Sequence, residues 1–95
     1  MRFDWDPKKA ELNEKKHGFS FAEAITAFDD PLSLIVDDKK HSVAEERKWL
    51  IGNTDAGRLA VVVFTERAEI IRVISARPAS RKEREIYDTI QRIPV

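Results

Sequence analysis

The chain has 95 residues, 42% of them apolar, which is enough for one domain with a single core and too short for two. Its 17 basic and 17 acidic residues cancel, so the net charge does not favour a strong non-specific hold on nucleic acid. The absence of cysteine excludes a disulfide framework and a thiolate metal site, while the lack of a signal pattern or of an apolar run near ~18 residues predicts a cytoplasmic protein without a membrane contact.

The first part of the chain is predicted to form a short strand and a surface helix. Residues 2–5 alternate polar and apolar side chains, as a half-buried strand does. Asp6 and Pro7 then form a helix start, because aspartate accepts hydrogen bonds from free amides and proline at the first helical position loses no needed donor. This helix is expected to end at His17, before Gly18.

A second helix is predicted to cover the sheet. Ser20 and Glu23 form a capping box, and residues 29–31, Asp-Asp-Pro, end the apolar pattern that follows it. The apolar stripe has spacings of three and four, which places its members on one face of a helix. It consists of Phe21, Ala24, Ile25 and Phe28.

The middle of the chain is predicted to contain two strands, residues 32–36 and residues 47–51. The second strand has Trp49 and Ile51 on one face. A polar turn at residues 37–40 (Asp-Asp-Lys-Lys) and a second capping box at residues 42–45 separate the two strands. Because few residues remain there, only about one turn of helix fits between them.

The strongest core signal is the run from Leu59 to Phe64, which is unbroken, apolar and rich in β-branched residues. A further strand, residues 70–76, follows after a loop of hairpin length, so the two strands are expected to pair antiparallel. Either Val61 or Val63 should then face the apolar stripe of the second helix.

A final helix is predicted after Pro78, where Ser80 and Glu83 form a third capping box. The predicted order is a strand, two helices, a four-strand meander and a helix. The fold class is therefore α+β, with a single antiparallel β-sheet, two N-terminal helices and one C-terminal helix. The inner face of the final helix is expected to carry Ile86, Tyr87 and Ile90.

Positive charge is concentrated on the hairpin and on the start of the final helix. Residues 58–84 carry seven basic and three acidic side chains, a local charge of +4, whereas residues 1–57 carry −3 and residues 85–95 carry −1. A buried hairpin is thus expected to present arginines on or beside one sheet. These are Arg58, Arg67, Arg72 and Arg77.

Three segments together resemble the BrnT family of bacterial toxins. They are FDWDPKKAELNEKKHGFSFAEAITAFDDP, HSVAEERKWLIG and GRLAVVVFTERAEIIRVISARPASRKEREIYD, and they cover nearly the full length. The motifs KHG, EER, FTER and SAR are weak alone but specific in this order and spacing. The resemblance implies a RelE-like fold, a single toxin domain over residues 1–95 and a ribonuclease activity that inhibits translation. It also implies a BrnA-type ribbon-helix-helix antitoxin that binds operator DNA, so that toxin and antitoxin repress their own promoter together.

Cleaving RNA by attack of a 2′-hydroxyl on its own phosphodiester needs a base, an acid and positive charge where the phosphorane forms, and requires no metal or cofactor. Arginine suits the third role through its planar, permanently charged fork. The candidates are Arg77, Arg58 and Arg67, and the strand-to-helix turn is expected to bring Arg84 near Arg77. The alternative for each is a surface arginine or a partner of a nearby glutamate.

The candidate acids and bases are His17 and Glu46. At a helix C-terminus, His17 would tend to be held protonated by the carbonyl ends, which suits an acid or a phosphate contact; alternatively it caps that helix together with Lys16. Glu83 is a possible base too, although its capping box is the simpler use. The candidate RNA-binding residues are Lys16, Arg47, Arg84 and His41.

Two questions stay open at the level of the sequence. Trp5 and Trp49 can stack on bases, but their apolar strand neighbours favour a place in the core. Tyr87 is a core residue or a catalytic one, and its position on the inner face of the last helix favours the core. The arginine cluster also fits a function from another class, a non-enzymatic module that binds a partner protein or DNA. Arginines look alike in sequence whether they stabilise a transition state or neutralise acidic partner residues.

Overall fold

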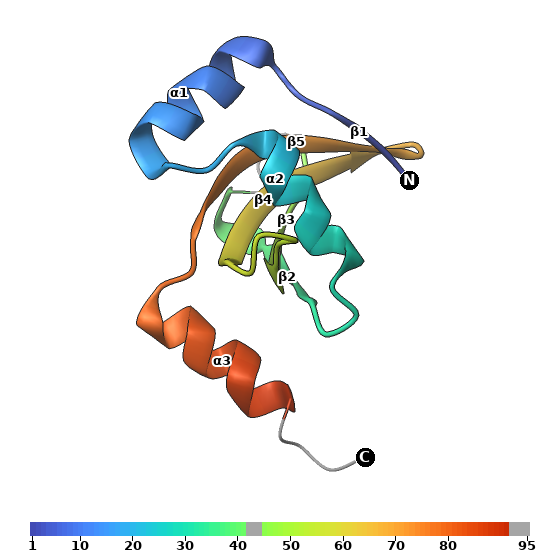
Figure 1. Ribbon diagram of the computed structural model, residues 1–95. Helices are drawn as coiled ribbons and strands as arrows, with labels where there is room; N and C mark the ends of the chain where they lie inside the picture. Colours follow the sequence, from blue (N-terminus) through green and yellow to red (C-terminus); the bar gives the residue numbers. More distant parts are fainter. Residues whose placement is uncertain (42–44, 92–95) are drawn as a thin grey trace.

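The computed structural model describes residues 1–41 and 45–91, which form one sheet with helices packed against it (Figure 1). Within these ranges, no helix has the length and apolar character needed to span a membrane. The elements are β1 (Arg2–Asp4), α1 (Pro7–His17), α2 (Phe21–Ala24), the 3₁₀ helix η1 (Ile25–Asp29), β2 (Leu34–Asp38), the 3₁₀ helix η2 (Lys39–His41), β3 (Arg47–Asn53), β4 (Leu59–Arg67), β5 (Ile70–Pro78) and α3 (Arg81–Gln91).

The sheet has the strand order β1-β5-β4-β3-β2. Strands β2 to β5 form the predicted antiparallel meander, which confirms the α+β class. The remaining strand, β1, pairs with β5 in parallel, so the sheet is mixed rather than wholly antiparallel. A parallel pair needs a long crossover, which the chain between β1 and β5 supplies, whereas each meander strand pairs with its neighbour through a short connection.

The predicted start and end of α1 are confirmed. The Asp6 carboxylate accepts a hydrogen bond from the Lys8 amide at 2.9 Å, and Pro7 opens the helix. Gly18 ends it in the left-handed conformation, with φ of 67°, which a residue with a side chain adopts at a cost.

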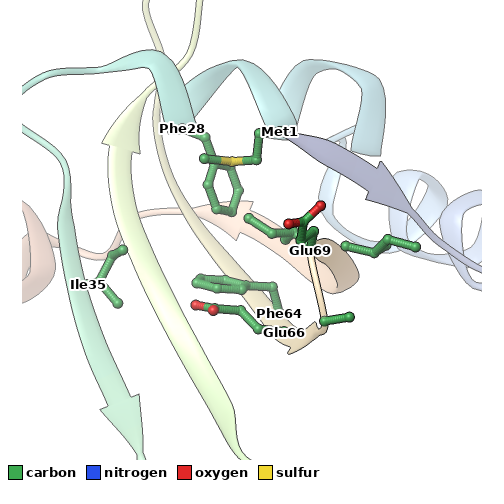
Figure 2. Close-up of a pocket in the computed structure, with 9 residues that line it drawn as sticks. Met1, Phe28, Ile35, Phe64, Glu66 and Glu69 are labelled. Carbon is green, nitrogen blue, oxygen red and sulfur yellow. The ribbon is translucent and has the colours of Figure 1, made fainter.

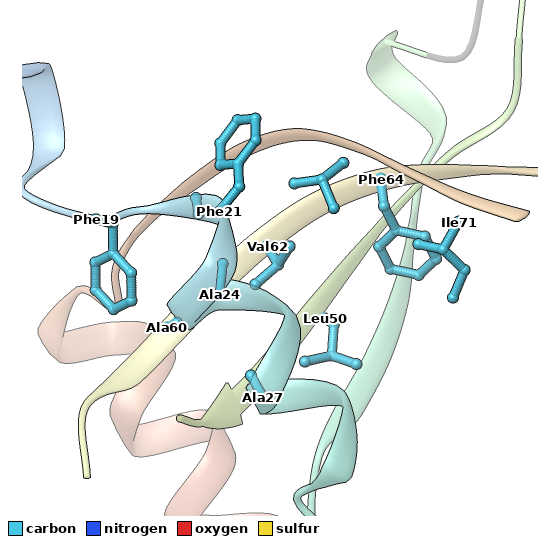
Figure 3. Close-up of a cluster of buried hydrophobic side chains, with 11 residues drawn as sticks. Phe19, Phe21, Ala24, Ala27, Leu50, Ala60, Val62, Phe64 and Ile71 are labelled. Atoms are coloured by element: carbon cyan, nitrogen blue, oxygen red, sulfur yellow. The ribbon is translucent and has the colours of Figure 1, made fainter. Parts of the chain in front are cut away.

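The main core lies between the α2–η1 segment and one face of the sheet. Figure 3 shows Phe19, Phe21 and Ala24 over the strands. The prediction of one α-helix through Phe28 is wrong beyond Ala24, because the chain continues as a 3₁₀ helix. At that transition the Thr26 hydroxyl donates to the Glu23 carbonyl at 2.6 Å, a local bond that competes with α-helical geometry.

Strand β4 is buried on both faces, and this made its orientation unreadable from the sequence. The prediction that Val61 or Val63 faces the helical stripe is wrong, because Val62 points into that core cluster. Val61 is equally buried but belongs to a smaller cluster on the opposite face. A strand with two apolar faces has no polar alternation to mark which side is inside.

Helix α3 packs against that opposite face through one residue of its predicted inner stripe. Tyr87 is buried against Ile51 and Val61, and its hydroxyl donates to an Asp30 carboxylate oxygen at 2.7 Å. Placing Ile86 and Ile90 on the inner face was wrong, because they are 41% and 44% exposed. The helix runs beyond the sheet, as Figure 1 shows, so it has no strand surface to cover with a full stripe.

Strand β2 lies two residues later than predicted and includes both aspartates that were expected in a turn. The second of them, Asp38, is buried and accepts a hydrogen bond from the Trp49 indole nitrogen at 2.9 Å. The hydrogen bond between Asp38 and Trp49 therefore holds β2 against β3 beyond the end of the apolar pattern of β2. The predicted capping box at residues 42–45 lies largely outside the described residues.

Candidate functional site

One face of the sheet gathers most of the arginines that the sequence singled out. Residues paired across neighbouring strands point to the same side, and the pairs Val61 with Arg77 and Thr65 with Arg72 put both arginines on the face away from α2. The pairs of β3 with β4 add Arg47 and Trp49, and Arg67 follows on β4. We call Arg47, Arg67, Arg72 and Arg77 the arginine face.

A β-bulge in β5 makes this arrangement possible. Val63 pairs with Ser75 and Phe64 pairs with Val73, so Ile74 is an extra residue without a partner of its own. Arg72 and Arg77 are five positions apart and would point to opposite sides of a regular strand. The bulge reverses the alternation between them and places both on one face.

At one end of the arginine face, Arg77 is held by Glu83 of α3. Both terminal nitrogens of the guanidinium donate to the two carboxylate oxygens at 2.7 Å. The carbon of the guanidinium also lies 5.8 Å from the centre of the Trp49 ring, within cation–π range. The sequence suggested either a capping role or a partner role for Glu83, and the structure gives it both, since Ser80 and Glu83 also complete the capping box at 2.8 and 3.2 Å.

These contacts lower the pKa of Glu83 to about 2, chiefly through the Arg77 hydrogen bonds and with help from Ser80, and they outweigh the effect of burial. Acid should therefore destabilise the domain. The contribution of Glu83 is complete above its ordinary pKa of 4.5 and is lost as the pH falls towards 2. It amounts to ~3 kcal/mol at most.

The measurement is urea unfolding at several pH values across this window, for the parent and for Glu83→Gln. The difference in stability between the two should shrink as the pH falls. The exposed carboxylate Glu66 supplies a control, Glu66→Gln, which should follow the parent. A constant difference between parent and Glu83→Gln would show that the ion pair does not set the acid response.

At the other end of the face, Arg67 is held by Glu45. Its nitrogens donate to the two carboxylate oxygens at 2.6 and 3.0 Å. The pKa of Glu45 is lowered by these bonds first, and then by the Arg67 charge, the Thr65 hydroxyl and the Arg47 charge. Beside this pair a cavity of about 160 Å³ opens between the strands and the start of α1. Its polar lining consists of Asp6, Lys9, Glu45, Arg47, Thr65, Arg67 and Arg72.

Arg58 lies apart from the arginine face, at the corner between α1 and α2. Its guanidinium donates to the Glu23 carboxylate and to the Gly18 carbonyl, and it stacks over the Phe19 ring at 3.9 Å. Glu23 also accepts from the Thr54 hydroxyl at 2.7 Å. This network ties the hairpin to the helices, so the structural alternative accounts fully for the contacts of Arg58.

The other candidate residues are spread over the surface. His17 and Lys16 end α1 beside the Arg58 corner, the first half-buried and the second exposed. Glu46 is exposed immediately before β3, and Arg84 is exposed on α3 next to the glutamate that contacts Arg77. The side chain of His41 lies outside the described residues.

Three residues in or beside the arginine face were not among the predicted site residues. Thr65 and Arg72 lie within or beside apolar runs. Glu45 is placed at the site only by its contact with Arg67, which is 22 positions away in the sequence. The motif that contains Thr65, FTER, is where the apolar run of β4 turns polar, and this was the available signal. Trp5 and Trp49 are both half-buried. Trp5 packs edge-on against Phe21 at 5.9 Å beside the main core, and Trp49 packs against the smaller cluster on the arginine face.

A second cavity, of about 240 Å³, lies at the end of the helix-covered face. Figure 2 shows Phe28 near Phe64, whose ring centres are 5.1 Å apart, with Glu66 and Glu69 beside them. Its apolar walls offer phosphate no hydrogen-bond donor, and its two carboxylates would repel the negative charge. The arginine face is therefore the better candidate for an anionic ligand.

The arginine face offers the donors that an anionic chain needs. Arg67 and Arg77 each place a fork against a carboxylate, and a phosphate group accepts the same two parallel bonds. Within residues 1–41 and 45–91, no three histidine, aspartate or glutamate side chains gather in a way that could hold a metal ion. The chemistry that these residues themselves can supply is stabilisation of negative charge.

Comparison with known proteins bears on the same residues. The family model described as a ribonuclease toxin, BrnT, of type II toxin-antitoxin systems matches residues 5–83. The crystal structure of the Brucella abortus ribonuclease toxin BrnT is similar in fold, with a TM-score of 0.67 and 28% sequence identity over 85% of this chain and 99% of that chain. A search of curated proteins finds no match. The matched range contains the arginine face and Glu83.

Proposed function

The chain belongs to the BrnT family of ribonuclease toxins of type II toxin-antitoxin systems, and from this premise we propose that it cleaves RNA on the arginine face. Residues 1–95 act as a single toxin domain in the cytoplasm, where RNA is translated. The observation that carries the proposal is the convergence of Arg47, Arg67, Arg72 and Arg77 on one side of a rigid sheet.

The proposed reaction is attack of a 2′-hydroxyl on its own phosphodiester, without a metal ion. Arg77 stabilises the charge that develops on the phosphorane, because its position is fixed by the hairpin and its fork is already oriented by Glu83. In the proposed complex, phosphate oxygens take up part of the position of the Glu83 carboxylate. Arg77 then exchanges at least one of its hydrogen bonds to Glu83 for a bond to the substrate. Arg47 and Arg67 contact the flanking backbone.

The candidate base is Glu46, which is exposed and adjoins Arg47 at the end of the arginine face away from Arg77. His17 shares the Arg58 corner with Lys16 on the α2 side of the sheet, away from Arg77, so its proposed role is a phosphate contact rather than proton transfer to the leaving oxygen. Arg84 on α3 is a proposed phosphate contact at the Arg77 end, and His41 is retained as a contact at the other.

The proposed biological role is inhibition of translation by RNA cleavage. An antitoxin of the BrnA type, with a ribbon-helix-helix part, would neutralise the toxin and carry the complex to operator DNA, so that the pair represses its own promoter. The expectation of an antitoxin partner rests on family membership. Expression of the chain alone should arrest growth, and expression together with the product of an adjacent antitoxin gene should relieve the arrest.

Incubating the purified protein with RNA, with and without chelator, tests the enzymatic proposal. We expect fragments that end in a cyclic phosphate, at equal rates in both conditions. Loss of cleavage with chelator would contradict metal independence. Stable binding of RNA, DNA or a partner protein without any cleavage would identify the chain as a non-enzymatic binding module instead.

A further inference from the structure

Thr65 is unusual among the buried polar residues. Its side chain is 1% exposed, and among the described residues its hydroxyl has no hydrogen-bond partner at bonding distance, although it lies near enough to Glu45 to help lower the pKa of that carboxyl. A buried hydroxyl without a partner is costly, and native proteins retain few of them. This hydroxyl lines the cavity beside Glu45, so a ligand in that cavity can supply the missing partner.

The surroundings of Thr65 define the chemistry of that ligand. Thr65 pairs with Arg47 on β3 and with Arg72 on β5, so the three side chains form a row across three strands on the arginine face. Lys9 and Arg67 complete the basic lining of the cavity. The lining also holds two carboxylates, Glu45 and Asp6, of which Asp6 already accepts a hydrogen bond from the Lys8 amide. Four cations and one hydroxyl donor outnumber them and match a phosphate group, whose oxygens accept such bonds.

The carboxylates near the cavity are held loosely enough to be replaced. The Arg67–Glu45 pair has side chains that are 58% and 39% exposed, and Arg72 meets Asp4 at 3.4 Å, also near the surface. Pairs in such positions stabilise a fold little, because water and salt screen them. A phosphate that binds Arg67 in the same two-pronged geometry can therefore take the place of Glu45.

We propose that this cavity is a backbone-phosphate subsite for RNA, separate from the Arg77 end of the face. The proposal rests on the proposed function, because it takes RNA as the ligand. Thr65 donates its hydroxyl to a non-bridging oxygen between Arg47 and Arg72, and Arg67 exchanges Glu45 for the phosphate. Thr65 and Val61, the partner of Arg77, are four residues apart on β4, which is about 13 Å. An RNA strand that touches both ends must run along β4.

The decisive variant is Thr65→Val, which keeps the shape and removes the hydroxyl. Its melting temperature should equal or exceed that of the parent, because an unpartnered buried hydroxyl is lost. Its affinity should fall about tenfold, both for inorganic phosphate and for a short 2′-O-methyl RNA, which lacks the attacking hydroxyl. Calorimetry measures both. Unchanged affinity for both probes overturns the proposal, and a loss for phosphate alone reduces the cavity to a free-anion site and also overturns it.

A matched pair of variants tests the role of Glu45. Glu45→Gln removes the competing charge and should tighten binding of both probes, whereas Glu66→Gln makes the same change in net charge beside Lys48 on the opposite face and should not. Equal effects of the two variants would mean that only net charge matters, against a subsite.

Cleavage assays on natural RNA separate this proposal from the first. If binding responds to Thr65 and Glu45 but no RNA is cut, the subsite stands and the ribonuclease activity does not. If RNA is cut but the affinity for both probes does not depend on Thr65 or Glu45, the ribonuclease activity stands and the subsite does not.

Discussion

Replacing Arg77 with alanine is expected to lower RNA cleavage by about 100-fold or more and to abolish growth arrest, because one well-aligned donor to a developing oxyanion is lost. Lysine at this position should restore activity only in part, since it keeps the charge but not the planar fork. Single-turnover cleavage by the purified variants measures the effect directly. Cleavage by Arg77→Ala at the parental rate would show that Arg77 takes no part in the reaction.

The ion pair with Glu83 requires a control for stability. Arg77→Ala leaves a 13% exposed carboxylate without its main partner, and the melting temperature should fall. The double variant Arg77→Ala/Glu83→Gln removes that unpaired charge, so it should regain stability and remain inactive. Glu83→Gln alone should retain cleavage. If the double variant folds like the parent and cleaves RNA at the parental rate, the arginine serves to hold α3 in place and not to bind the substrate.

Replacing Val62 with aspartate is expected to unfold the domain. Val62 is fully buried between Leu50 and Ala76, its partners on β3 and β5, beneath the α2–η1 segment. An unpaired carboxylate in such a core costs several kcal/mol, which is comparable with the ~5–15 kcal/mol that holds a whole domain together. Circular dichroism and thermal melting of the purified variant provide the measurement.

The neighbouring valine supplies the control. Val63 is half-buried on the arginine face, where a carboxylate keeps some contact with water and lies near cationic groups. Val63→Asp should therefore fold with a modest loss of stability. Near-parental melting of Val62→Asp, or equal damage from both variants, would mean that the orientation of β4 is wrong.

The sequence by itself determined those features of the fold that depend on local chemistry. Asp6 with Pro7 and Gly18 set the ends of α1, and the Ser80–Glu83 box starts α3. The run of apolar residues in β4 and its short loop to β5 were enough for the hairpin, because neighbouring strands pair through few intervening residues. Order and spacing of short motifs also indicated the toxin family that the family model then matched.

The tertiary structure decided which charges act together. A single extra residue, Ile74, reverses the alternation of β5 and brings Arg72 to the face of Arg77, and no propensity of the sequence around it marks a bulge. Pairing of Arg67 with Glu45, and of Arg58 with Glu23, joins residues 22 and 35 positions apart. Such contacts follow from register and packing rather than from local pattern. They divide arginines that look alike in sequence into those that brace the fold, such as Arg58, and those that lie on the arginine face.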